Sequence, residues 1–233
     1  MTQIREIAFD TETTGLDWAG EDRIIELGAI ELINHIPTGK SFRRYINPGR
    51  SVSEATIRIT GITDADLKDK PAFSDPDIVD AFLAFVGDAT LVAHNAQFDR
   101  GFLNAELERY RYSPILEPRW IDTVAMARLK FPGAPASLDA LCRRFNISLE
   151  SRTMHGALLD AQLLADVYLE LLGGRARRFE FEEISQGVEA HRPAKARGQA
   201  LPSLRTEEEA KAHAGFISQI GDQALWHKYT KTN

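Results

Sequence analysis

Hydrophobic residues in the first half of the chain follow the short periods of β-strands. Apolar or alternating runs at residues 4–9, 24–33 and 41–46 predict three strands, and Gly39 is the turn residue expected between the second and the third. The apolar segment "ATLVAH" at 89–94 predicts a fourth strand.

Helical spacing begins after the third strand. Phe98, Phe102 and Leu107 form one apolar stripe, which predicts a helix over 97–110. Ser137 is a suitable N-cap for a later helix. The same spacing predicts further helices at 78–86, 122–129, 137–145 and 157–172. This order of strands and helices predicts an α/β fold, a mixed β-sheet flanked by helices.

The C-terminal part has a different composition. Residues 185–203 contain few large apolar side chains, two prolines and charges of both signs, so they cannot repay the entropy of ordering. We therefore expect a domain at 1–174, a flexible linker at 175–203 and a separate segment at 204–233.

That last segment begins with a helix signal. Thr206 and Glu209 have the spacing of a capping box. The helix either folds back on its own domain or serves as a tethered docking peptide for a partner protein, and the long polar linker favours docking. The apolar residues that would make the contact are Phe216, Ile217, Ile220, Leu225 and Trp226.

Composition narrows the class of protein. With 233 residues and 43% hydrophobic content, the chain can bury a full core. Its single cysteine, Cys142, cannot form an internal disulfide, and the sequence contains neither a signal segment nor an apolar run of about 18 residues. We expect a cytoplasmic protein with no membrane partner.

Net charge gives weaker guidance. The value of −6 argues against a nucleic-acid partner, because such proteins are usually basic. If some of the acids hold divalent cations, however, the formal charge misrepresents the field that a substrate meets.

Acidic residues occur where strands end and helices begin. In "FDTETTG", Asp10 and Glu12 lie two residues apart and therefore point to the same side of a strand. Asp99 falls in the first turn of its helix, where an acid also interacts favourably with the helix dipole. Asp160 lies on the apolar face of the 157–172 helix, and His155 precedes it by five residues. Each residue alone has an ordinary structural explanation.

Together, the four acids predict a metal site. A mixed sheet can bring Asp10, Glu12, Asp99 and Asp160 to one edge, where two carboxylates 4 Å apart repel by roughly 4 kcal/mol at an effective dielectric near 20. Two Mg²⁺ or Mn²⁺ ions would compensate this charge. Such a site suits displacement at phosphorus, with one ion activating water and the other stabilising the leaving oxygen. A histidine such as His155 can accept the proton from that water near neutral pH.

At these residues the chain resembles the DEDDh family of 3′→5′ exonucleases. The family motifs match "DTETTG", "HNAQFD" and "HGALLD". The resemblance implies an RNase H-like fold and two divalent cations, with His155 as the general base and Asp10, Glu12, Asp99 and Asp160 as metal ligands. A histidine five residues before the last acid, rather than a tyrosine four before it, separates this group from its tyrosine-containing sister.

Longer phrases such as "SLDALCRRF" and "RTMHGALLDAQLLADVYL" are similar to the proofreading (epsilon) subunits of bacterial DNA polymerase III. The likeness extends to "TEEEAKAHAG" and "ALW" near the C-terminus. It implies that segment 204–233 docks on the polymerase (alpha) subunit.

The resemblance also implies contacts with a DNA 3′ end. Ile59 corresponds to an apolar wedge, and Thr60 stands where the family often has histidine. The backbone N–H of Thr13 is expected to reach the terminal sugar, and Asn95 to contact substrate. Related proteins also carry a sliding-clamp peptide after the nuclease domain. Here Phe179 and Phe181 are the corresponding residues, but no glutamine precedes them.

Three functions remain open from the sequence. The first is a proofreading 3′→5′ DNA exonuclease that releases nucleoside 5′-monophosphates. The second is an RNA-directed exonuclease of the same family, because the same carboxylates serve either sugar and only the 2′-hydroxyl separates the substrates. The third is a catalytically silent scaffold subunit.

Overall fold

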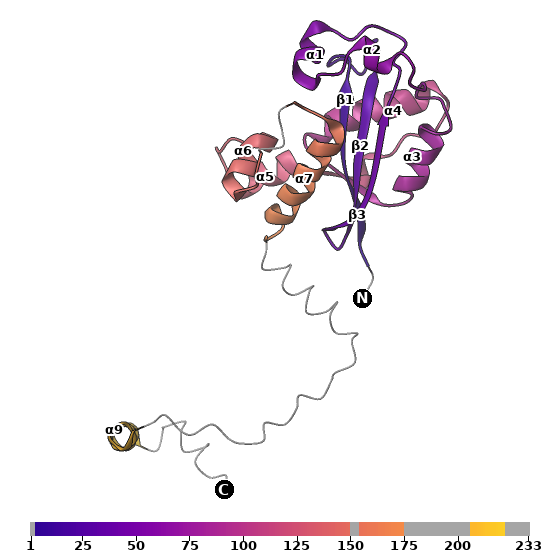
Figure 1. The fold of residues 1–233 in the computed structure, drawn as a ribbon. Helices are drawn as coiled ribbons and strands as arrows, with labels where there is room; N and C mark the ends of the chain where they lie inside the picture. Colours follow the sequence, from indigo (N-terminus) through magenta and orange to yellow (C-terminus); the bar gives the residue numbers. More distant parts are fainter. Residues whose placement is uncertain (1–2, 150–153, 175–205, 222–233) are drawn as a thin grey trace. The chain divides into compact units, whose positions relative to one another are not determined.

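The computed structural model describes residues 3–149, 154–174 and 206–221 (Figure 1). The chain divides into two compact units, residues 1–186 and 187–233, which are described separately below. The predicted linker at 175–203, the clamp candidates Phe179 and Phe181, and the docking candidates Leu225 and Trp226 lie outside the described residues.

A five-stranded mixed sheet forms the centre of the first unit. The strands lie in the order β3-β2-β1-β4-β5. The first three strands in the chain pair antiparallel, whereas β4 lies parallel to β1 and β5 parallel to β4. The strands are β1 (Arg5–Thr13), β2 (Ile24–Ile33), β3 (Ile36–Tyr45), β4 (Thr90–Ala93) and β5 (Trp120–Asp122). The predicted mixed sheet is confirmed.

Helices lie on both sides of this sheet. Figure 1 shows α7 with α5 and α6 on one side, and α3 and α4 on the other. The described helices of the first unit are α1 (Glu54–Thr60), α2 (Asp64–Leu67), α3 (Val79–Val86), α4 (Ala96–Arg109), α5 (Thr123–Lys130), α6 (Leu138–Phe145) and α7 (Ala157–Leu171), with a 3₁₀ turn η1 (Glu117–Arg119).

The alternation along β1 determines which side its acids face. Ile7 and Phe9 are fully buried in the cluster that includes α3 and α4, whereas Ala8 is fully buried in the cluster that includes α7. Since side chains two apart share a face, Asp10 and Glu12 belong to the side of Ala8 and α7. The strand continues through both acids to Thr13, beyond the predicted end at residue 9.

The hairpin between β2 and β3 differs from the prediction. Gly39 lies inside β3, and the turn is formed by Asn34 and His35, whose φ values are 51° and 71°. Two consecutive residues with positive φ are typical of the type I′ turn that joins twisted antiparallel strands, and asparagine tolerates that conformation. The short elements α1, α2 and β5 were not predicted, because so few residues show no clear period.

The second unit contains one described helix, α9 (Glu207–Ile220). The capping box predicted at its start is confirmed, since Thr206 and Glu209 exchange side-chain and backbone hydrogen bonds. Phe216 is 60% exposed and Ile220 44% exposed, and Ile217 is partly exposed. Within the described ranges, no helix is both long and apolar enough to cross a membrane.

Candidate active site

Residues distant in the sequence meet where β1 ends beside the start of α7. Asp10 from β1, together with His155 and Asp160, lines a cavity of about 320 Å³. Four further residues complete its wall: His94, Ser137, Leu138 and Asp139. The wall combines ionisable side chains with the apolar Leu138, and the cavity is large enough for a phosphate group with its counterions.

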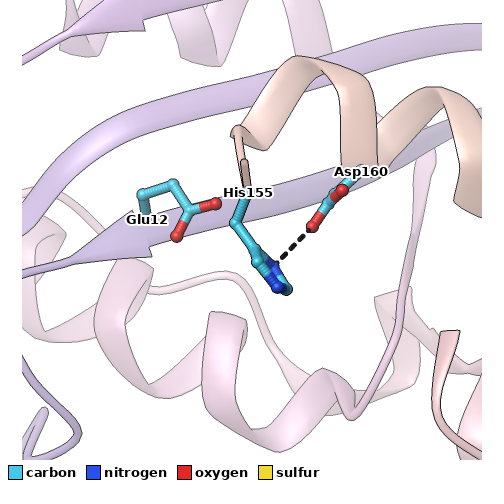
Figure 2. Close-up of side chains that lie close together, drawn as sticks. All are labelled: Glu12, His155 and Asp160. Carbon is cyan, nitrogen blue, oxygen red and sulfur yellow. Dashed lines mark hydrogen bonds and ion pairs between the residues drawn. The ribbon is translucent and has the colours of Figure 1, made fainter. Parts of the chain in front are cut away.

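Glu12, His155 and Asp160 form the most compact part of the site. One potential ligand atom from each lies within 4.8 Å of the others (Figure 2). Asp160 is 4% exposed and occupies the first turn of α7, as predicted from its place on the apolar face. The predicted acids Glu12 and Asp160 are thus brought together by strand pairing and helix packing.

The histidine has a defined orientation. His155 Nδ1 lies 3.2 Å from Asp160 Oδ2 (Figure 2). An ionised carboxylate can only accept, so this contact favours the tautomer with the hydrogen on Nδ1 and with Nε2 as the proton acceptor. In that tautomer Nε2 can accept a proton from water.

The close approach of α7 to the sheet depends on Gly28. This glycine pairs with Asp10 in the β1–β2 ladder. A Cβ atom on Gly28 would lie 2.1 Å from the carbonyl carbon of Ala157 and 2.3 Å from the amide nitrogen of Leu158. The first turn of α7 therefore lies directly on the backbone of β2, which places Asp160 opposite the acids of β1.

Asp99 occupies a different position from the other three acids. It lies in the first turn of α4, as predicted, but is 3% exposed and accepts a hydrogen bond of 2.8 Å from the Thr11 hydroxyl. Thr11 lies between Asp10 and Glu12 in β1. Burial raises the pKa of Asp99 to about 7. The nearby charge of Asp122 adds to this shift, whereas the hydrogen bonds from Thr11 oppose it. The Asp99 carboxylate is therefore costly to ionise unless a cation compensates it, and it is not among the residues that line the cavity.

This pKa predicts how stability depends on pH in the absence of divalent cations. Between about pH 4 and pH 7 the folded Asp99 keeps a proton that the unfolded chain has already lost. The unfolding free energy should therefore fall as pH rises through this window, by a few kcal/mol at about 1.4 kcal/mol per pH unit. Urea unfolding in chelator at several pH values measures the slope. Asp99→Asn should flatten it, and equal slopes for the two proteins would contradict the assignment.

The donor set fits a hard divalent cation. Carboxylate oxygens are the ligands that Mg²⁺ and Mn²⁺ prefer, and Glu12 and Asp160 offer two of them within 4.8 Å. Asp10 lines the same cavity as Asp160. The residues present at the end of β1 can therefore hold such an ion.

Ile59, a predicted substrate residue, lies beside this cavity. It is 53% exposed on α1, and its carbonyl accepts a hydrogen bond of 3.0 Å from the His155 backbone N–H. Ile59, Met154 and His155 line an adjoining cavity of about 440 Å³ to which Arg58 and Arg143 contribute charge.

The other predicted substrate residues differ in their exposure to solvent: Asn95 is exposed, whereas Thr13 and Thr60 are buried. Asn95 is exposed at the start of α4 in a left-handed conformation, and its N–H donates to Asp122. Thr13 is 8% exposed, and its hydroxyl donates to the Gly15 carbonyl. Thr60 is equally buried, and its hydroxyl bonds to the backbone of Thr56 and Ile62, so it stabilises the end of α1.

Sequence reasoning missed two kinds of residue. His94 and Asp139 line the cavity, but the segments that contain them point to Asp99 and to a helix start rather than to these two side chains. Glu26 lies within the apolar run at 24–33, which predicts only a strand, although it is fully buried and accepts a hydrogen bond from the first turn of α7. An acid in the middle of an apolar run was the available signal.

Known proteins resemble this chain along nearly its whole length. A family profile described as exonuclease matches residues 7–168. The DNA polymerase III subunit epsilon of Rickettsia felis is 45% identical over 229 residues, covering 94% of this chain and 98% of that protein. The protein of the same name from Salmonella typhimurium is 40% identical over 237 residues, covering 95% of this chain and 97% of that protein.

Solved structures of exonucleases also resemble the first unit of this chain. Exonuclease X in complex with 5′ overhanging duplex DNA has a TM-score of 0.56 and 28% identity, covering 72% of this chain and 90% of that one. The nuclease domain of 3′hExo, a DEDDh family member bound to rAMP, has a TM-score of 0.61 and 20% identity, covering 73% and 91%, and supports the fold alone. The chain therefore belongs to the exonuclease family, as a relative of the DNA polymerase III epsilon subunits.

Proposed function

We propose that this chain proofreads for a replicative DNA polymerase, removing mispaired 3′-terminal nucleotides as 5′-monophosphates. The observation that carries the proposal is the convergence of Glu12, His155 and Asp160 beside the exposed side chain of Ile59. An acidic, cation-binding cluster adjoining an apolar contact suits the last phosphodiester and the last base of a strand.

Catalysis follows from the orientation of the histidine. Two Mg²⁺ or Mn²⁺ ions, held by Asp10, Glu12, Asp99 and Asp160, would supply Lewis acidity and offset the charge of the phosphate. His155 Nε2 accepts the proton of the attacking water, while the Nδ1–H group continues to donate its hydrogen bond to Asp160. The new P–O bond forms as the bond from phosphorus to the 3′-oxygen of the preceding nucleotide breaks. That oxygen takes a proton from solvent and becomes the new 3′-hydroxyl, and the released nucleotide keeps its 5′-phosphate.

Preference for mispaired ends needs no reading of sequence. An unpaired terminus separates from its template at lower cost than a paired one. Ile59 would lie against the last base, and Arg58 and Arg143 offer positive charge along the adjoining cavity. Thr13 and Asn95 would contact the terminal nucleotide, whereas Thr60 would support the turn after Ile59.

The partner is expected to be the polymerase III alpha subunit in the cytoplasm. Residues 204–233 would dock there through α9, whose exposed apolar residues include Phe216 and Ile220. The relatives named as epsilon subunits match 94% and 95% of this chain, so the matches extend beyond the domain predicted at 1–174. A sliding-clamp contact at Phe179 and Phe181 is a weaker part of the proposal.

A labelled primer tests the function. A 5′-labelled DNA primer ending in a mismatch should shorten from its 3′ end in Mg²⁺, remain intact in chelator, and shorten faster than the same primer ending in a pair. Equal rates on paired and mispaired ends would contradict proofreading. Cleavage of single-stranded RNA but not DNA would assign the RNA-directed activity instead, and no cleavage of either would leave a scaffold.

A further inference from the structure

The start of α7 carries both His155 and Asp160, yet its own residues do not cap it. The N-cap position is Gly156, which has no side chain to accept from the first backbone N–H groups. Those groups have no partner within the helix, so they need acceptors from elsewhere. The first intrahelical bond is donated only at Asp160, whose N–H reaches the Gly156 carbonyl at 2.9 Å.

Glu26 supplies one of these acceptors from β2. Its Oε2 accepts the N–H of Ala157, the first residue of α7, at 3.1 Å. The side chain is 0% exposed. A carboxylate at a helix N-terminus also interacts favourably with the helix dipole.

The other oxygen of the same carboxylate is held from β3. Arg43 Nε donates to Glu26 Oε1 at 2.6 Å, and the Arg43 guanidinium also contacts the Tyr45 hydroxyl. A buried carboxylate with both oxygens bound has a single orientation. Glu26 therefore joins the start of α7 to two strands of the sheet.

Strand register connects Glu26, the anchor of the first turn of α7, to the acids of β1. Glu26 pairs directly with Glu12 in the β1–β2 ladder. Like charges opposite one another on a sheet are unfavourable, and Arg43 compensates the charge of Glu26. One residue thus neighbours Glu12 on one side and holds the helix of His155 and Asp160 on the other.

We propose that Glu26 is a positioning residue, which fixes the first turn of α7 so that His155 and Asp160 face Glu12. The proposal rests on the nuclease function above. Glu26 acts through the Ala157 N–H bond, so the reach of its oxygen matters more than its charge. A helix start displaced by about 1 Å would cost roughly 10²-fold in rate.

Two substitutions separate reach from charge. Glu26→Gln keeps an oxygen at the same distance along the side chain and loses the charge, and the partly exposed Arg43 can turn to solvent. Glu26→Asp keeps the charge but is one methylene shorter. Glu31 provides the matched control, because it is 4% exposed on the same strand and binds Arg5 at 2.7 Å.

Kinetics on the mismatched primer give the first readout. Glu26→Asp should lower kcat by about 10-fold to 10²-fold with KM little changed. Glu26→Gln should stay within about threefold of wild type, and Glu31→Asp should leave kcat unchanged despite a loss of urea stability. A wild-type kcat for Glu26→Asp, or an equal loss for Glu31→Asp, would overturn the proposal.

Two readouts do not depend on activity. Amide hydrogen exchange in a peptide spanning residues 155–160 should be faster in Glu26→Asp than in Glu31→Asp, and calorimetry should show weaker Mn²⁺ binding only in the Glu26 variant. Unchanged exchange and Mn²⁺ affinity would also refute the anchor. If wild type itself does not cleave the primer, the nuclease function fails, while these two measurements still test the anchor.

Discussion

Asp160→Ala is expected to lower the rate of 3′-end cleavage by about 10³-fold or more. The substitution removes a buried carboxylate that lies within 4.8 Å of Glu12 and His155 and also fixes the histidine tautomer. Both cation binding and proton transfer are lost together. Single-turnover cleavage of a mismatched primer measures the rate.

Thermal unfolding supplies an independent measurement for the same variant. Mn²⁺ should raise the melting temperature of the wild type, because it binds only the folded state and relieves carboxylate repulsion. Asp160→Ala should lose this response. Asp166→Ala is the control, since it removes an aspartate from the same helix at a position that does not line the cavity. A metal response that persists in Asp160→Ala would remove this residue from the ligand set.

Gly28→Ala should be among the most destabilising single-methyl additions in this chain. The new Cβ would overlap the backbone of Ala157, at 2.1 Å from its carbonyl carbon and 2.2 Å from its oxygen. Backbone cannot rotate away as a side chain can, so either α7 or β2 must move. We expect a loss of about 3 kcal/mol or more in unfolding free energy. Cleavage should also fall in the fraction that remains folded, because the helix carrying His155 and Asp160 is displaced.

Gly156→Ala is the matched control for that prediction. Its φ of −160° is ordinary extended backbone, and the nearest atom to its new Cβ is Glu26 Oε2 at 3.9 Å. The expected loss is below about 1 kcal/mol. Urea unfolding of both variants decides the matter, and similar losses at the two glycines would show that the α7–β2 contact is not the constraint.

Much of this protein followed from local sequence. The apolar runs around Ile7 and Ile30 predicted strands, and the spacing of Phe98, Phe102 and Leu107 predicted α4, because burial of one face imposes a period of two or of 3.6. Capping residues were equally direct, as with Ser137 and Thr206. The motifs predicted the acids of the site and the family.

Other features depended on partners distant in the chain. The turn at Asn34 and His35 was missed because glycine is the stronger local signal, whereas the pairing of Ile33 with Ile36 selects a two-residue turn. The bond between Asp99 and Thr11 joins two elements, so no local pattern contains it. Nor does α1 show a period, since it is only seven residues long.

The sequence by itself therefore predicted which residues carry the chemistry, because hard carboxylates at strand ends and helix starts are specific in type and spacing. Only the tertiary structure decided how they are held. Gly28 allows the first turn of α7 to pack directly on β2, because it has no Cβ. Glu26 accepts the hydrogen bond of the first N–H of α7, so residues 26–28 contact residues 157–158. Such contacts depend on the packing of a helix against a strand that is distant in the chain, so the hydrophobic period of either segment does not predict them.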